Sequence, residues 1–185
     1  MSREGFVESV REGLMLLPQH IKLLLRVYDD PDVPESGRVL ASGSLVHWLA
    51  GANTIPGVRG ILAYVDDLLL MRLALARLDA LAPEALARHR EDWPEVLDAL
   101  DTQVGLIRSR LGGTVSVFES ALDRIGDLKH MGRTATECVL DGEAGTMLYE
   151  EVQAAMVNMD LDEAAVVREL KGGLDRALDG LQRRV

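Results

Sequence analysis

The sequence predicts an all-α fold, and three observations support that prediction. Apolar residues recur with the 3.6-residue period of an α-helix along most of the 185-residue chain. Hydrophobic residues make up 48% of the sequence but aromatic residues only 4%, so the core must be built from aliphatic side chains. A β-sandwich would need more aromatic and β-branched residues, and strand-forming patterns are nearly absent. We therefore expect a bundle of about seven or eight helices.

The beginning of the chain predicts helices separated by proline-rich turns. Residues 6–28 favour one helix or a helix pair that restarts at Pro18, because proline removes a backbone donor. The "DDPDVP" run at 29–34 ends this helical stretch, and Pro34 suits the first turn of the next helix. The segment "AGANTIPG" at 50–57 contains glycine and asparagine and predicts the loop that follows.

Residues 58–81 predict a helix that is apolar on nearly every face, which is typical of a central or a lipid-facing helix. A membrane span needs about 20 mostly apolar residues. This segment is long enough, but Asp66, Asp67 and Arg72 would each cost about 2.5–3.5 kcal/mol at the bilayer centre. We therefore expect a central buried helix and keep an integral membrane protein as an alternative. Its apolar positions include Ile61, Leu62, Val65, Leu68, Leu69, Leu73 and Leu78.

The second half has the more regular pattern. Pro83 predicts the start of a short helix, and residues 95–128 predict an antiparallel helical hairpin that turns at Gly112–Gly113. Thr134 and Glu137 have the spacing of a capping box. The stripe of the hairpin that we expect to be buried comprises Leu100, Val104, Ile107, Phe118, Leu122 and Ile125.

Two further helices are expected at 143–159 and 162–181. Trp93–Pro94 marks a plausible boundary, which divides the chain into a helical unit at 1–92 and a second unit at 93–185. Each unit alone offers a modest core, so we expect the two to pack as one globular body.

Charge and cysteine content exclude several classes of function. The formal net charge is −10 and no run of lysine and arginine compensates it, so nucleic-acid binding is not expected and an anionic membrane surface is disfavoured. Cys138 is the only cysteine, which rules out an intramolecular disulfide. The beginning of the sequence lacks the apolar segment of a secretory signal, so we expect a cytoplasmic location, with membrane-peripheral attachment as the alternative.

Two motifs, "DPDVP" at 30–34 and "YVDD" at 64–67, are separated by a spacing that matches a known family without a gap. Residues 14–80 thereby resemble the YkvA-like DUF1232 family of small helical bacterial proteins. The family pattern has an "RDPRVP"-like turn, the loop "SPIDLIPDFIP" and a helix with Tyr-Leu-Asp-Asp. The resemblance implies a helical fold and no defined activity, and some relatives are membrane-associated.

The chain departs from the family pattern in the loop. Asn53 and Gly57 stand where the family has aspartates, so two of four family carboxylates are missing and Asp66 and Asp67 remain. If the family's acidic residues form one polar site, this chain keeps half of it.

The candidate polar site therefore consists of Tyr64, Asp66, Asp67 and Asn53, with no catalytic or metal-binding residue assigned. We favour a structural role, in which one aspartate is exposed and the other pairs with a helix N-terminus or an arginine such as Arg26 or Arg38. The four histidines show no metal-binding spacing and are expected on the surface or half-buried.

These observations predict a non-enzymatic, cytosolic helical protein that acts through protein–protein or membrane-peripheral contacts. A protein partner or self-association is expected, and neither a cofactor nor a small-molecule ligand is assigned. The alternatives are a metal-dependent module or enzyme that uses Asp66 and Asp67, and an integral membrane protein.

Overall fold

The computed structural model describes residues 3–183 and confirms the all-α prediction. Eleven α-helical segments occur in this part of the chain, and nine of them are at least nine residues long. The predicted seven or eight is therefore too few. The difference arises mainly where prolines and glycines divide apolar stretches into shorter helices.

The breaks between the first four helices fall near the proline- and glycine-containing segments that the sequence analysis identified. Pro18 lies in the first turn of α2, where a backbone N–H would have no acceptor within the helix, so proline costs no hydrogen bond there. The predicted restart of the helix at Pro18 is therefore confirmed. Residues 51–60 form the loop between α3 and α4, so the loop extends past the predicted 50–57 and α4 begins at residue 61 instead of 58. The helices are α1 (Arg3–Met15), α2 (Leu17–Asp29), α3 (Glu35–Ala50) and α4 (Ile61–Leu81).

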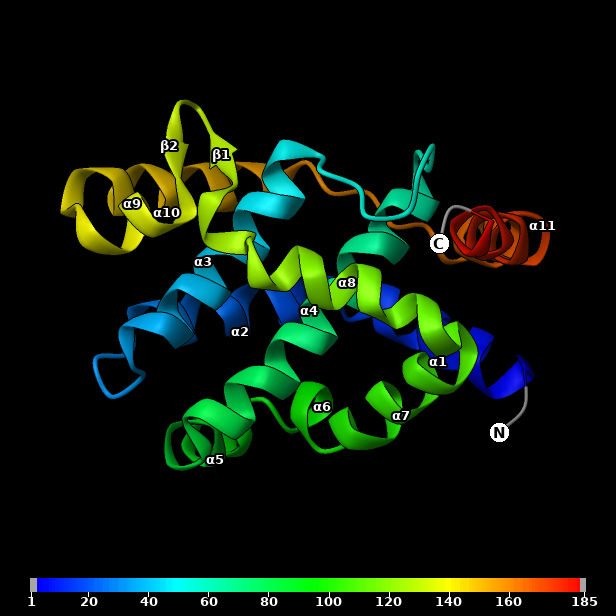
Figure 1. The fold of residues 1–185 in the computed structure, drawn as a ribbon, viewed down its shortest axis with the longest axis horizontal. Helices are drawn as coiled ribbons and strands as arrows, with labels where there is room; N and C mark the ends of the chain where they lie inside the picture. Colours follow the sequence, from blue (N-terminus) through cyan, green and yellow to red (C-terminus); the bar gives the residue numbers. More distant parts are fainter. Residues whose placement is uncertain (1–2, 184–185) are drawn as a thin grey trace.

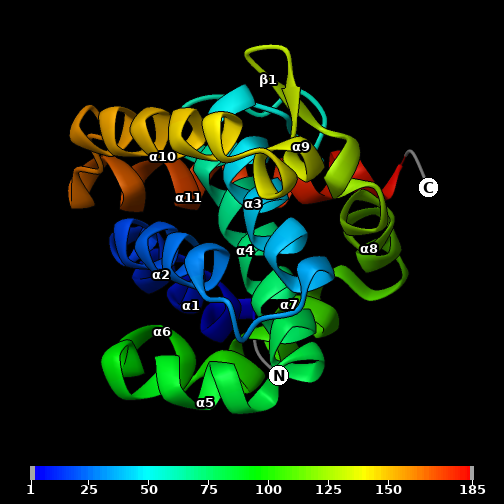
Figure 2. The same cartoon turned by 90° about the vertical axis from the view of Figure 1, so that its left-hand side faces the viewer.

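Helix α4 runs through the middle of the molecule, with α3 beside it and α1, α7, α8 and α11 around it (Figures 1 and 2). It contributes more buried residues than any other element of the described chain, as its all-round apolar pattern predicts. No helix within residues 3–183 combines the length and the apolar character needed to cross a membrane.

The middle of the chain wraps around one end of α4. The six side chains predicted to line the 95–128 hairpin are all buried, and α7 and α8 meet at the predicted glycine turn. Both helices also pack against α4. The elements are α5 (Pro83–Asp92), α6 (Pro94–Leu97), α7 (Leu100–Leu111), the 3-10 turn η1 (Gly112–Thr114) and α8 (Val115–Asp123).

The last part contains a feature that helical periodicity does not predict, a two-stranded hairpin. The capping box predicted from Thr134 and Glu137 is confirmed at the start of α9. The elements are η2 (Ile125–Asp127), β1 (Lys129–His130), β2 (Arg133–Thr134), α9 (Ala135–Leu140), α10 (Gly142–Val157) and α11 (Glu163–Gln182).

Packing crosses the boundary at residues 92–93 in several places. The Tyr28 hydroxyl donates to the Cys138 carbonyl at 2.6 Å, and the Ser42 hydroxyl donates to the Ala135 carbonyl at 2.9 Å. These hydrogen bonds join α2 and α3 to α9. Because buried polar groups need partners, these contacts fix how the two halves meet.

Within residues 3–183, two basic side chains lie inside the core without a carboxylate partner. Arg72 on α4 donates to the hydroxyl and the carbonyl of Ser9, and burial lowers its pKa to about 10. The His20 Nδ1 contacts the Leu16 carbonyl at 2.9 Å, while its buried Nε2 has no hydrogen-bond partner. Burial and the charge of Arg72 lower the pKa of His20 to about 4, so this histidine is neutral in the fold.

We predict that Phe118→Ala lowers the free energy of unfolding by about 3–5 kcal/mol, because the side chain is fully buried and the truncation leaves a cavity. Urea unfolding of the two proteins measures this difference. A loss below about 1 kcal/mol would show that the site collapses around the smaller side chain.

We also predict that His20→Leu reduces the acid sensitivity of the protein. The folded pKa of about 4 lies below the ordinary histidine pKa of 6.5, so the unfolded chain binds more protons between these values. The wild type should then lose stability as the pH falls from 6.5 to 4, by on the order of 3 kcal/mol more than the variant. Urea unfolding at pH 7, 5.5 and 4.5 tests this, and parallel pH profiles would contradict it.

Candidate functional site

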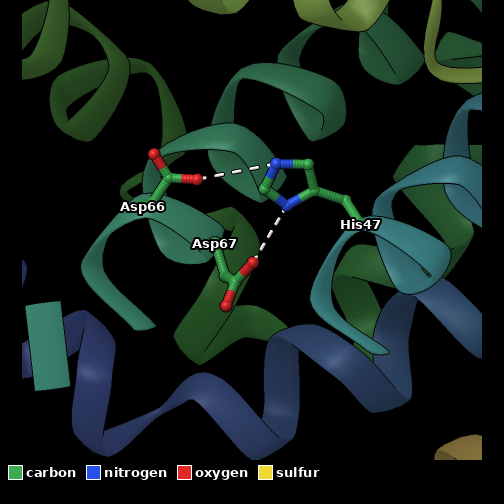
Figure 3. Close-up of side chains that lie close together, drawn as sticks. All are labelled: His47, Asp66 and Asp67. Atoms are coloured by element: carbon green, nitrogen blue, oxygen red, sulfur yellow. Dashed lines mark hydrogen bonds and ion pairs between the residues drawn. The ribbon is translucent and has the colours of Figure 1, made fainter. Parts of the chain in front are cut away.

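The two aspartates of the candidate site meet a histidine that the sequence prediction left out. His47 lies in the last turn of α3, and its ring reaches between Asp66 and Asp67 near the start of α4 (Figure 3). Its Nδ1 is 2.9 Å from Asp67 Oδ1, and its Nε2 is 3.5 Å from Asp66 Oδ2. The three residues are 3%, 0% and 4% exposed in chain order, so the cluster is closed to bulk solvent.

Asp66 also holds the loop between α3 and α4. The backbone N–H of Thr54 donates to Asp66 Oδ2 at 3.0 Å, and that of Ile55 donates to Asp66 Oδ1 at 2.6 Å. Each carboxylate oxygen thus accepts one backbone donor that has no partner in a helix or sheet. The loop therefore depends on a single side chain for two of its hydrogen bonds.

Helical geometry explains why the side chains of the neighbouring Asp66 and Asp67 point in different directions. Adjacent residues on a helix point about 100° apart. Asp66 is therefore directed at the loop and Asp67 at the ring of His47. Because α3 ends immediately before the loop, the histidine in its last turn lies opposite both carboxylates.

Burial dominates the electrostatics of the cluster. It raises the pKa of Asp66 to about 6, against the opposing effect of the Thr54 hydrogen bond and the nearby His47. Burial also raises the pKa of Asp67, while the hydrogen bond from His47 lowers it. Both carboxylates thus bind a proton more readily than an exposed aspartate does.

The structure brings together only two of the four predicted site residues. Tyr64 is half-buried, and Asn53 is exposed with its amide donating to the Gly51 carbonyl at 3.2 Å. The expectation that one aspartate is exposed is wrong, because both are buried. The proposed partners Arg26 and Arg38 are also wrong, since the ion pairs of both aspartates within the described chain run to His47.

The expectation for the histidines holds only in part. His89 and His130 are half-buried, but His20 and His47 are buried. A sequence signal for His47 existed, because it is the one polar residue in an apolar run at the end of a predicted helix. Its partners lie about twenty residues away, so no short motif joins them.

A second unusual site is the tip of the β1–β2 hairpin, which projects from the surface in both overall views (Figures 1 and 2). His130 pairs with Arg133, so Met131 and Gly132 form a two-residue turn. Both have positive φ, 51° for Met131 and 81° for Gly132. Such turns normally carry asparagine or aspartate before the glycine, and methionine is strained there.

Met131 gains no burial in return for this strain, because it is 66% exposed. It lies beside a small hollow of about 20 Å³ whose other lining residues include Val46, Cys138 and the partly exposed Met147. Two flexible thioethers therefore border one apolar depression. His130 and Arg133 flank it.

We predict that Asp66→Asn costs about 1–3 kcal/mol of unfolding free energy, because an amide accepts hydrogen bonds on only one atom and leaves one loop N–H unpaired. Asp67→Asn should cost less than about 1 kcal/mol, since its amide oxygen can still accept from His47. Thermal and urea unfolding of both variants measure the difference.

Asp79→Asn on the same helix is the matched control. Asp79 is partly exposed, and its only ion pair within the described residues is a 3.9 Å contact with Arg90, so its substitution should change stability by less than about 0.5 kcal/mol. Equal losses for the three variants would contradict the role assigned to Asp66.

Comparisons of this chain with models of protein families, with curated proteins and with solved structures give no match.

Proposed function

We propose that this chain is a non-enzymatic binding protein of the YkvA-like DUF1232 type that contacts a protein partner through the tip of the β1–β2 hairpin. The observation that carries this proposal is Met131, which combines a strained backbone with an exposed apolar side chain. Backbone strain of this kind persists at functional positions because stability alone would select another residue. The family assignment rests on the two sequence motifs.

The chemistry of the hairpin tip favours a protein surface as the partner. Methionine side chains adapt to irregular apolar contacts, which suits the pair of Met131 and Met147 to an apolar patch on a partner surface. The net charge of −10 opposes attachment to anionic lipid, and one exposed methionine supplies little insertion energy. A membrane surface is therefore the less favoured partner.

An enzymatic role for Asp66 and Asp67 receives less support from the geometry. General acid–base chemistry requires that a substrate reach the reacting group within hydrogen-bond distance. The three clustered residues are almost entirely buried, and they line none of the surface hollows described for residues 3–183. Their hydrogen bonds run to the loop and to each other, which suits a structural role.

We predict that Met131→Asn raises the free energy of unfolding by about 1 kcal/mol, because asparagine tolerates the left-handed conformation that strains methionine. The same substitution should weaken partner binding. Met131→Leu is the matched control, since it keeps both the strain and the apolar surface. Urea unfolding of the three proteins measures stability, and a lower stability of Met131→Asn would contradict the strain argument.

Site-specific photocrosslinking tests the contact itself. A photoreactive residue at position 131 in cells should yield a specific protein adduct, which mass spectrometry identifies. The same group at Val157, an exposed position on α10, is the control. Identical adducts at both positions, adducts with lipid alone, or no adduct at position 131 would overturn the proposal.

A further inference from the structure

His47 presents its two ring nitrogens to two different carboxylates (Figure 3). At 2.9 Å, the contact between Nδ1 and Asp67 Oδ1 has the length of a hydrogen bond, which places the ring proton on Nδ1. In that tautomer Nε2 carries a lone pair. This lone pair faces two oxygen atoms, Asp66 Oδ2 and Thr54 Oγ1.

The distances around Nε2 are long for hydrogen bonds and suitable for ligands that share a cation. Asp66 Oδ2 lies 3.5 Å and Thr54 Oγ1 3.4 Å from Nε2, whereas N–H···O bonds are usually about 2.7–3.2 Å. Ligands bonded at about 2.1 Å to a tetrahedral Zn²⁺ ion lie about 3.4 Å apart. Nε2 is therefore spaced from each of these two oxygens as from a neighbouring ligand.

The composition of the cluster also suits a cation. It places two carboxylates and one imidazole, with ligand atoms within 4.8 Å of one another, in a nearly solvent-free site. Within the described chain, the ion pairs of these carboxylates involve no lysine or arginine. Buried carboxylates need a partner, and a divalent ion would supply one.

We propose that His47, Asp66 and Asp67 form a structural site for one divalent transition-metal ion, with Zn²⁺ the best match. His47 Nε2 and Asp66 Oδ2 are the ligands, with Thr54 Oγ1 beside them. Asp67 accepts the Nδ1 proton of His47 and holds the ring in place, as carboxylates commonly do behind zinc-bound histidines.

The donor set selects the class of ion. A mixture of imidazole nitrogen and carboxylate oxygen suits zinc and its first-row neighbours. Ca²⁺ needs six to eight oxygen ligands, and Mg²⁺ prefers oxygen in a near-ideal octahedron. Asp66 keeps free lone pairs for the ion, because each of its oxygens accepts only one backbone hydrogen bond.

A bound ion at this place would fasten the loop at residues 51–60 to both of its flanking helices. Asp66 already holds the loop through Thr54 and Ile55, and His47 belongs to α3. The site is buried, so the ion would stabilise the fold without reaching a substrate. This inference stands independently of the hairpin contact proposed above.

Calorimetric titration of the chelator-treated, full-length protein with ZnCl₂ tests the proposal, with elemental analysis after dialysis. We expect one zinc ion per chain, a higher melting temperature with zinc, and no comparable effect of MgCl₂ or CaCl₂. His47→Gln should abolish the uptake. Asp67→Asn, which removes only the supporting charge, should weaken zinc affinity by about 10–100-fold.

His89→Gln is the matched control, because His89 also contacts a carboxylate, Asp30, at 2.9 Å but lies nearer the surface. It should bind zinc like the wild type. If circular dichroism shows that His47→Gln does not fold, two other measurements test the proposal. They are the zinc affinity of Asp67→Asn and the tetrahedral absorption bands of Co²⁺ bound to the wild type. A folded wild type that takes up no zinc, or uptake lost in His89→Gln but kept in His47→Gln or Asp67→Asn, would overturn the proposal.

Discussion

The contact on which much of this fold depends is the imidazole of His47 between the carboxylates of Asp66 and Asp67. It joins the end of α3 to the start of α4, the central helix. Through Asp66 it also fixes the loop between them, since that side chain accepts two of the loop's backbone N–H groups. Later elements pack against both of the helices that this junction joins.

The same junction illustrates how a buried polar group can be tolerated. Burying carboxylates is unfavourable unless hydrogen bonds and opposite charge compensate the lost hydration. Here the compensation comes from backbone donors and from a histidine, and a divalent ion would complete it. Arg72 and His20 show a contrasting solution, because Arg72 donates only to Ser9 and His20 loses its proton.

The hairpin at Lys129–Thr134 differs from the rest of the molecule in how it uses its residues. In the core, each apolar side chain gains burial, whereas Met131 is exposed on a strained backbone. The proposed function accounts for this position by a contact with a partner protein. In that proposal the buried cluster stabilises the fold and the hairpin tip binds the partner.

The sequence by itself determined the helical class, the restart at Pro18, the capping box at Thr134 and the burial of α4. These features follow from local rules, such as helical periodicity and the missing N–H of proline. The tertiary structure decided which groups meet. His47 lies about twenty residues from its aspartates, and nothing in its neighbourhood specifies them. Likewise, the φ values of Met131 and Gly132 depend on the pairing of His130 with Arg133, because only that pairing forces a two-residue turn.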